Sequence, residues 1–185
     1  MDVAVVEAPA KEYGVTPNKT KIHRFAFILG RRYITIGSSC VVQRSAMLRG
    51  DMGEIRVGKY CTIGESAILR PPSRPPGVEQ QHRPGRRNLL QIADHTVIEE
   101  DCVIQAAFIG SCVQVCKGAI VSNLAIVHNC CYLAPGCVVP PGAVVPPFSI
   151  MEGNPAVRTG ELPETCREIA INHTVTTFER FQLME

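Results

Sequence analysis

The sequence has no tryptophan, and aromatic residues make up only 5% of it. Its net charge is only +2, so neither the basic surface nor the stacking platforms of nucleic-acid-binding proteins are indicated. The sequence also lacks a run of about 18 apolar residues and the layout of a signal peptide. We therefore expect a soluble, intracellular protein that neither binds nucleic acid nor inserts into a membrane, and 185 residues suit one domain.

Paired C-x-x-C motifs are also absent, although the chain has nine cysteines. This absence and the odd count argue against a zinc knuckle or a disulfide framework and favour a reducing compartment. Five of the cysteines occupy one position of a six-residue repeat that is described in the next paragraph, and alanine or another small residue fills the same position in other units. We therefore interpret these cysteines as small buried hydrophobic residues. They are Cys40, Cys61, Cys102, Cys130 and Cys137.

A six-residue repeat runs through most of the chain. Each unit has an aliphatic residue at position i, often glycine or an acidic residue at i+1, and a small residue at i+4. A short fixed period of this kind is typical of a hexapeptide β-helix. Clear units begin at Ile36, Val57, Ile63, Ile98 and Ile109.

Three units make one triangular coil, and a longer period supports this interpretation. Ile92, Ile109 and Ile126 are spaced by seventeen residues, so we expect them to start equivalent turns. Strands of successive coils lie about 4.8 Å apart, so inward aliphatic residues stack and each corner admits only a small side chain. The expected fold is all-β: a single-stranded left-handed parallel β-helix with stability supplied by stacking between neighbouring coils. We expect Cys102→Trp to destabilise it and Glu99→Lys to be nearly silent.

The repeat predicts three regions with one interruption. Residues 1–21 are expected to form an N-terminal arm, 22–160 the β-helix and 161–185 a C-terminal helix. Residues 70–91 are rich in proline and arginine and predict a long inserted loop. This loop is either a solvated segment or a docking surface for an acidic partner. Its arginines, the candidate contacts, are Arg70, Arg74, Arg83, Arg86 and Arg87.

The C-terminal segment predicts one helix that begins at Pro163. The residues expected on one stripe of this helix are Cys166, Ile169, Ala170, His173 and Thr177. Phe178 and Phe181 either anchor an interface with a partner or pack on the prism. The Thr-rich stretch has poor helix propensity, so packing against the prism or against a partner must hold the helix.

Two enzyme classes with this fold can be tested against the sequence. Leu48-Arg49-Gly50-Asp51, with Ile55-Arg56-Val57-Gly58, resembles γ-class carbonic anhydrases, in which three histidines hold zinc. The resemblance places these three positions at Arg70, Glu100 and Gln105. An arginine, a glutamate and a glutamine make a poor zinc site, so we expect no metal and no cofactor.

Gly153-Asn154-Pro155-Ala156 resembles the point at which hexapeptide acyltransferases leave the prism. Such an enzyme needs a general base, usually a histidine. His95 and His128 should point outward and are available, but neither has a carboxylate placed to orient it. A hexapeptide-repeat enzyme of either class is therefore the alternative function.

Several stretches together resemble the dynactin subunit 5 family, one of two β-helical subunits at the pointed end of dynactin. The narrower signals are Ile68-Leu69-Arg70-Pro71-Pro72 and Gly160-Glu161-Leu162-Pro163-Glu164. Broader ones are Arg49-Gly50-Asp51, Ile98-Glu99-Glu100-Asp101-Cys102 and Val144-Val145-Pro146-Pro147-Phe148. The resemblance spans residues 18 to 185, although the loop is richer in arginine and proline than the family pattern.

The resemblance implies a non-catalytic scaffold in the cytoplasm, on the cytoskeleton. It would pair with the sister β-helical subunit and contact the actin-related protein and the zinc-binding subunit of the pointed end. There it would support cargo-adaptor binding and dynein-driven transport along microtubules. A rigid prism with open edge strands and a terminal helix suits such lateral association.

Overall fold

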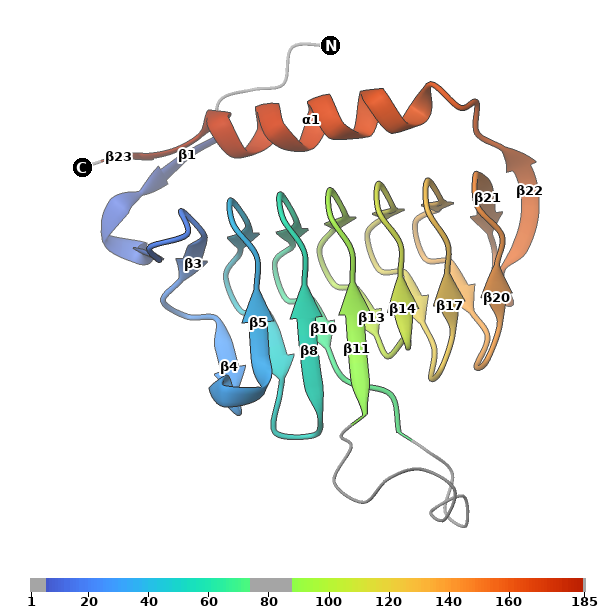
Figure 1. Cartoon of the computed structure of the whole chain (residues 1–185), viewed down its shortest axis with the longest axis horizontal. Coiled ribbons are helices and arrows are strands. Elements are labelled where there is room, and N and C mark those ends of the chain that lie inside the picture. The colour runs from blue at the N-terminus through green and yellow to red at the C-terminus, as the bar shows by residue number, and fades with distance from the viewer. Residues whose placement is uncertain (1–5, 74–87, 185) are drawn as a thin grey trace.

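Short strands separated by tight corners wind the chain into a stack of triangular coils, crossed along its length by one helix (Figure 1). The computed structural model describes residues 6–73 and 88–184. Strands in successive coils pair in parallel and form three flat sheets, named sheets I, II and III here. The parallel β-helix expected from the six-residue repeat is confirmed.

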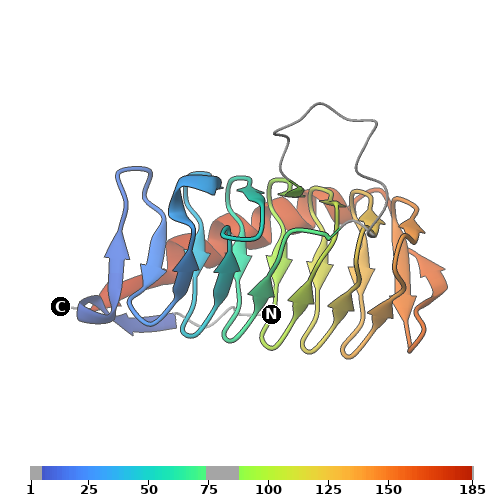
Figure 2. The same cartoon turned by 90° about the horizontal axis from the view of Figure 1, so that it is seen from below.

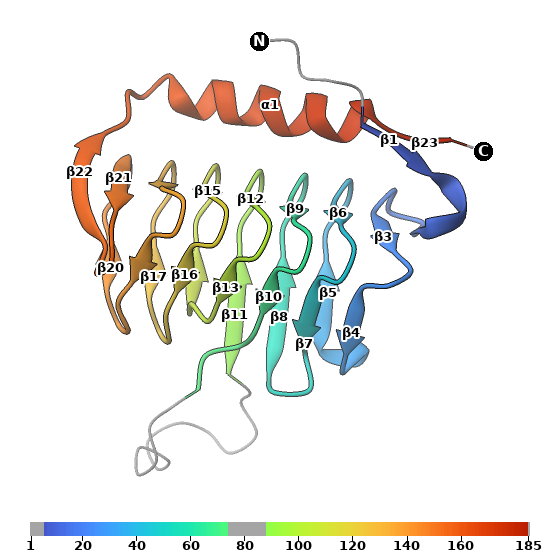
Figure 3. The same cartoon turned by 180° about the vertical axis from the view of Figure 1, so that it is seen from behind.

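Sheet I has nine strands. Its inner seven strands pair in parallel, and an antiparallel strand closes it at each end. In order the strands are β2 (Tyr13–Val15), β3 (Lys21–His23), β6 (Val41–Val42), β9 (Thr62–Ile63), β12 (Val97–Ile98), β15 (Gln114–Val115), β18 (Tyr132–Leu133), β21 (Ser149–Glu152) and β22 (Val157–Glu161). Figure 3 labels several of them, such as β6, β9, β12 and β15, on the side of the stack next to the helix.

Sheets II and III each have six parallel strands, and the described chain adds no closing strand to them. Sheet II contains β4 (Phe27–Leu29), β7 (Met47–Arg49), β10 (Ile68–Leu69), β13 (Val103–Ile104), β16 (Ile120–Val121) and β19 (Val138–Val139). Sheet III contains β5 (Ile34–Ile36), β8 (Glu54–Val57), β11 (Leu89–Ile92), β14 (Phe108–Ile109), β17 (Ile126–Val127) and β20 (Val144–Val145).

The core is the column of inward side chains along the axis. Aliphatic residues at position i, such as Ile63, Ile98 and Ile109, are buried, as the repeat predicts. The glycine at i+1 marks a close approach between coils, because a Cβ at Gly64 would lie 2.4 Å from the backbone carbon of Glu99. Burying each aliphatic side chain contributes roughly 1.5–3 kcal/mol, so the stack depends on coil-to-coil contact.

The seventeen-residue period holds for one step and then fails. Ile92 pairs with Ile109, but the partner of Ile109 in the next coil is Val127, eighteen residues on. Ile109 follows Ile104 by five positions instead of the six of the repeat, which shortens that coil. A one-residue offset turns a strand residue to the opposite face, so Val127 points inward and Ile126 outward, contrary to the sequence prediction.

The segment expected as an N-terminal arm contains regular elements. β1 (Val6–Pro9) pairs in parallel with β23 (Phe181–Met184), and a short 3-10 helix, η1 (Ala10–Glu12), leads into β2. A second 3-10 helix, η2 (Arg31–Tyr33), follows β4. The two ends of the chain therefore meet at the first coil.

The inserted loop expected at residues 70–91 ends earlier than predicted, because β11 begins at Leu89.

The helix α1 (Cys166–Arg180) lies along the row of corners between sheets III and I, and Figure 2 shows it running along the length of the stack. It begins three residues after the expected Pro163, whose carbonyl accepts a hydrogen bond from the Cys166 amide. Of the expected stripe, Ile169 is 66% exposed and His173 is exposed, whereas the buried residue of the helix is Thr174. No helix of the described residues is long and apolar enough to cross a membrane.

Candidate functional site

The position of a zinc ligand in the carbonic anhydrase resemblance is filled by a hydrogen-bonded pair. Arg70 and Gln105 follow β10 and β13, which are adjacent strands. With its amide oxygen turned towards Arg70, Gln105 accepts from the Arg70 Nε at 2.7 Å and also from a terminal guanidinium nitrogen. The two side chains satisfy each other, and a guanidinium repels a cation.

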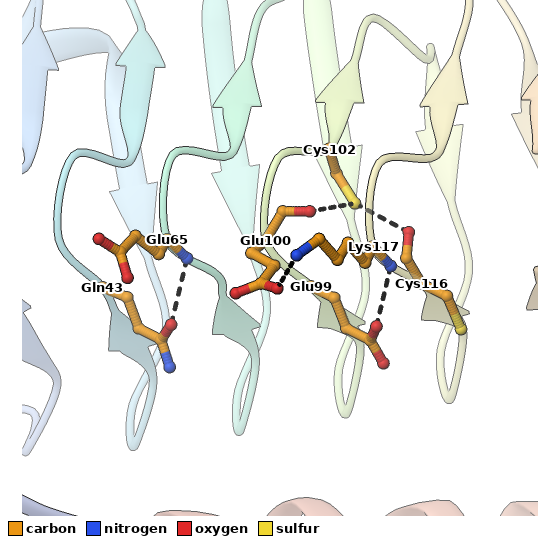
Figure 4. A network of polar contacts seen from close by, with 7 residues as sticks. All are labelled: Gln43, Glu65, Glu99, Glu100, Cys102, Cys116 and Lys117. Carbon is orange, nitrogen blue, oxygen red and sulfur yellow. Dashed lines mark hydrogen bonds and ion pairs between the residues drawn. The ribbon is translucent and has the colours of Figure 1, made fainter. Parts of the chain in front are cut away.

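Glu100, the third position, makes a separate ion pair. Its carboxylate lies 2.6 Å from the Lys117 Nζ on the corner between sheets I and II, shown in Figure 4. The three residues therefore do not form one ligand set, and their chemistry does not fit zinc. Among the described residues, no group of three His, Cys, Asp or Glu side chains could hold a metal ion.

The corner in Figure 4 is instead tied together by side chains that accept from the backbone of the next coil. Glu99 accepts from the Lys117 amide at 2.8 Å and from the Gln114 side chain at 3.0 Å. Gln43 accepts from the Glu65 amide at 3.1 Å. Glu99→Lys would lose both bonds of Glu99, contacts that the expectation of a nearly silent change did not include; that expectation stays a prediction.

His95, the first candidate base for acyl transfer, is held by the helix. Its Nδ1 lies 2.8 Å from the Thr174 hydroxyl, which itself lies 3.0 Å from the Ala170 carbonyl and donates to it. The ring stacks on Tyr60 with an interplanar angle of 4°. Burial lowers the pKa of His95, opposed by the nearby Asp94. These contacts give His95 a structural role in docking α1.

His128, the second candidate, is exposed on the surface. The neighbouring Asn129 side chain accepts from the Ser111 amide at 2.9 Å, so it braces a corner. Likewise Asp94 accepts from the Lys59 amide at 2.8 Å. The polar groups beside both histidines thus connect coils.

A cavity of about 420 Å³ lies between α1 and sheet I. His95 and His173 lie on its wall, but no Asp or Glu of the described chain does. A general base in this cavity would lack a carboxylate to orient it, which the acyl-transfer hypothesis needs. The rest of the wall is mainly apolar and includes Val97, Cys112, Tyr132 and Cys166.

All nine cysteines are free thiols, and eight are buried. Cys40, Cys61, Cys102 and Cys137 occupy the small corner position as predicted. Cys130 does not, because the one-residue offset gives that position to Cys131.

Cys130 instead lies with Cys112 and Cys166 where the corner row meets α1. Burial raises the pKa of each of these thiols, so they are weak nucleophiles. Cys40 differs, since a hydrogen bond from Cys61 lowers its pKa, but its side chain is fully buried.

The corner cysteines also have a role that sequence reasoning missed. The Cys102 Sγ donates to the Cys116 carbonyl of the next coil at 3.1 Å, and Cys40 and Cys131 make the same bond at 3.0 and 3.1 Å. Thr96 uses its hydroxyl in the same way, at 2.8 Å from the Gly110 carbonyl. The sequence signal for this role was Thr96, which brings a hydroxyl group to the i+4 position of the repeat.

The residues expected to contact partners fall into three groups: two pack on the prism, one is paired beside the loop, and four lie outside the described residues. Phe181 is 4% exposed and packs on Val41, and Phe178 packs edge-to-face on Tyr60, so both pack on the prism. Arg70 pairs with Gln105 beside the loop. The remaining arginines, Arg74, Arg83, Arg86 and Arg87, lie outside the described residues.

Solved structures with a similar fold include hexapeptide-repeat transferases. A hexapeptide transferase family protein from Anaplasma phagocytophilum superposes with a TM-score of 0.66 at 19% identity, covering 97% of this chain and 96% of that one. AntD, an N-acyltransferase from Bacillus cereus solved with dTDP and 3-hydroxybutyryl-CoA, gives 0.67 at 12% identity, covering 86% and 88%. At these identities the likeness shows the fold alone.

Sequence comparison is more specific. The profile of the dynactin subunit 5 family matches residues 1–184. A curated relative, dynactin subunit 5 of Dictyostelium discoideum, is 35% identical over 170 residues, which cover 92% of this chain and 83% of the relative. The resemblance seen in the loop and helix motifs thus extends over the whole fold, and the chain belongs to the dynactin subunit 5 family.

Proposed function

We propose that this chain is a non-catalytic structural and adaptor subunit of the pointed-end complex of dynactin. In this role it supports the binding of cargo adaptors and dynein-driven transport along microtubules. The observation that carries the proposal is the family match over residues 1–184. The pairing of Arg70 with Gln105 and of Glu100 with Lys117 supports a non-catalytic role, because it fills the carbonic anhydrase positions with satisfied side chains.

The proposed partners are the sister β-helical subunit, as a heterodimer, the actin-related protein and the zinc-binding subunit of the pointed end, and dynein cargo adaptors. The proposed location is the cytoplasm, on the cytoskeleton. Flat sheets II and III and their open edge strands offer rigid surfaces for these contacts. The proposed partner contacts stay Arg70, the loop arginines Arg74, Arg83, Arg86 and Arg87, and the partly buried Phe178, whereas Phe181 is buried against Val41.

Affinity purification of the tagged full chain from its native cytosol tests the proposal. We expect the other pointed-end subunits to co-purify at a fixed stoichiometry through a subsequent sizing step. Recovery of the chain as a lone homotrimer would count against the proposal.

The alternative, a hexapeptide-repeat enzyme, is favoured by one observation, the cavity beside His95 and His173. Metal analysis and calorimetric titration with coenzyme A test it on the purified chain. We expect no stoichiometric zinc and no saturable binding of coenzyme A. One zinc per chain, or coenzyme A binding that His95→Gln abolishes, would support the enzyme instead.

A further inference from the structure

The first coil carries an apolar patch on its outer face. Phe25, Phe27 and Leu29 alternate along β4 and the corner before it, and they are 61%, 52% and 41% exposed. Alternate residues of a strand point to the same face, so the three side chains form one row. Outward residues of sheet II continue this row, since Phe27 is in register with Met47 and Met47 with Ile68. Large apolar side chains gathered at a surface usually mark a contact.

Four arginines lie beside this patch along the chain or in the next coil, and the patch is named the β4 patch here. Arg24 precedes it, Arg31 and Arg32 follow it in η2, and Arg44 of the next coil lies 5.8 Å from the Phe25 ring centroid. Within residues 6–73 and 88–184, none of the four takes part in an ion pair. The β4 patch therefore has positive charge that the described chain does not neutralise, and this favours an acidic partner.

In the part of the chain that the structure describes, the strand beneath the patch is an open edge. β4 is the last strand of sheet II at this end, whereas the neighbouring edge of sheet I is closed by β2, antiparallel to β3. Figure 1 shows β4 at the end of the stack.

The opposite end of the stack is built differently. There β19 is followed by Pro140 and Pro141, and β20 by Pro146 and Pro147. Proline blocks strand pairing, and β4 has no proline beside it.

We propose that β4 is a docking site for an extended acidic segment of a partner protein, which adds to sheet II as a further strand. Its backbone pairs with the open edge, as β2 does with β3. Its apolar side chains cover Phe25, Phe27 and Leu29, and its carboxylates face the arginines. The open edge and the aromatic row favour a peptide strand over a nucleic acid or a lipid surface, which needs only the charge.

The inference rests on the proposed function only for the source of the strand, a subunit or adaptor of the same assembly. Failure of the chain to co-purify with dynactin would remove that source and leave the docking site to be decided by the binding measurement below.

The test is fluorescence anisotropy with the purified full chain and a labelled synthetic peptide in which valine and glutamate alternate. Two control peptides replace glutamate with lysine or carry N-methyl groups that block strand pairing. We expect the acidic peptide to bind roughly tenfold or more tightly than either control, with an affinity that falls as salt rises. Equal binding of all three peptides would overturn the proposal.

Matched variants locate the site. Phe27→Glu, and Arg31→Glu combined with Arg32→Glu, should each weaken binding roughly tenfold or more. Val144→Glu, at a similarly exposed apolar residue of sheet III, and Arg167→Glu, on α1, should not. Circular dichroism confirms that each variant is folded. Binding that these variants leave unchanged, or equal displacement of the peptide by polyuridine or phosphatidylserine vesicles, would contradict the proposed strand site.

Discussion

At the scale of single residues, one side chain per coil connects the prism to its helix. Tyr60, His95, Cys112 and Cys130 occupy equivalent corners with φ between 53° and 58°, in the left-handed region. Tyr60 contacts Phe178, His95 contacts Thr174, and Cys112 lies near the Arg167 backbone. The identity of these corner residues therefore determines how α1 docks.

The His95 contact predicts a dependence on pH. Burial lowers the pKa of His95 below its ordinary value of 6.5, so the unfolded or undocked state binds more protons below that pH. The contribution of His95 is fully present above about pH 6.5 and is lost as the pH falls towards the lowered folded-state pKa. Hydrogen exchange in α1 should become faster in this window. His95→Gln should remove much of the change, and an identical acid response in this variant would contradict the assignment.

The corner cysteines predict a second residue effect. Cys102→Trp should lower the free energy of unfolding by about 1–3 kcal/mol, because the corner has no room for an indole. Cys102→Thr should cost less, since Thr96 holds the equivalent position with its hydroxyl bonded to the next coil. Chemical denaturation measures both. A tryptophan variant as stable as the threonine variant would show that the corner is not closely packed.

The hydrogen bonds at this corner also explain one buried polar atom. The Ser149 hydroxyl has the same position in the last coil and has no hydrogen-bond partner among residues 6–73 and 88–184. It lacks one because no further coil supplies a carbonyl above it.

Much of the pattern of inward and outward residues could be predicted from the sequence, and the errors of that prediction have physical causes. The inward positions follow from the six-residue repeat, as Ile63 and Ile98 show. The misplacement of Cys130 followed from one shortened coil, which a fixed period cannot reveal. The bonds of Glu99 join coils, and its partners Gln114 and Lys117 come from the next coil, so no local pattern indicated them.

At the scale of elements, α1 is a strap tied at both ends. β22 precedes it at the last coil, and β23 follows it and pairs with β1 at the first coil. Near the end of the helix, the Lys21 Nζ donates to the Phe178 and Phe181 carbonyls and lies 4.3 Å from the Phe178 ring centroid. A lysine there satisfies free carbonyls and complements the helix dipole.

Lys21→Met tests this tie. Loss of the charge removes the bonds to the two carbonyls, and we expect faster hydrogen exchange over the last turn of α1 and β23, with a stability loss of roughly 0.5–2 kcal/mol. Lys59→Met, at an exposed lysine, is the matched control and should behave as wild type. Equal exchange in both variants would mean that the strap is held elsewhere.

The helix was predictable as an element, but its orientation was not. The sequence predicted a stripe that includes Ile169 but not which residue faces the prism; the structure leaves Ile169 exposed and buries Thr174. The hydroxyl of Thr174 is buried because it has partners in His95 and in the Ala170 carbonyl. Those partners lie on a corner 79 residues away and on the previous helical turn, so a hydrophobic pattern carries no sign of them.

At the scale of the whole molecule, the prism is closed unevenly. Sheet I is capped at both ends by β2 and β22, while sheets II and III, as far as the described residues go, end in open strands. A solenoid with uncapped ends is expected to meet other proteins there. The filled carbonic anhydrase positions and the family membership fit a molecule whose surfaces, more than its cavity, are functional.

The central claim is that this chain works as a member of a larger assembly. The most direct test is the native mass and subunit composition of the complex that contains the tagged chain, measured by native mass spectrometry after gentle purification. The account predicts one large complex that holds the chain with the pointed-end subunits of dynactin in fixed ratio. A free homotrimer that carries one zinc ion per chain would contradict it.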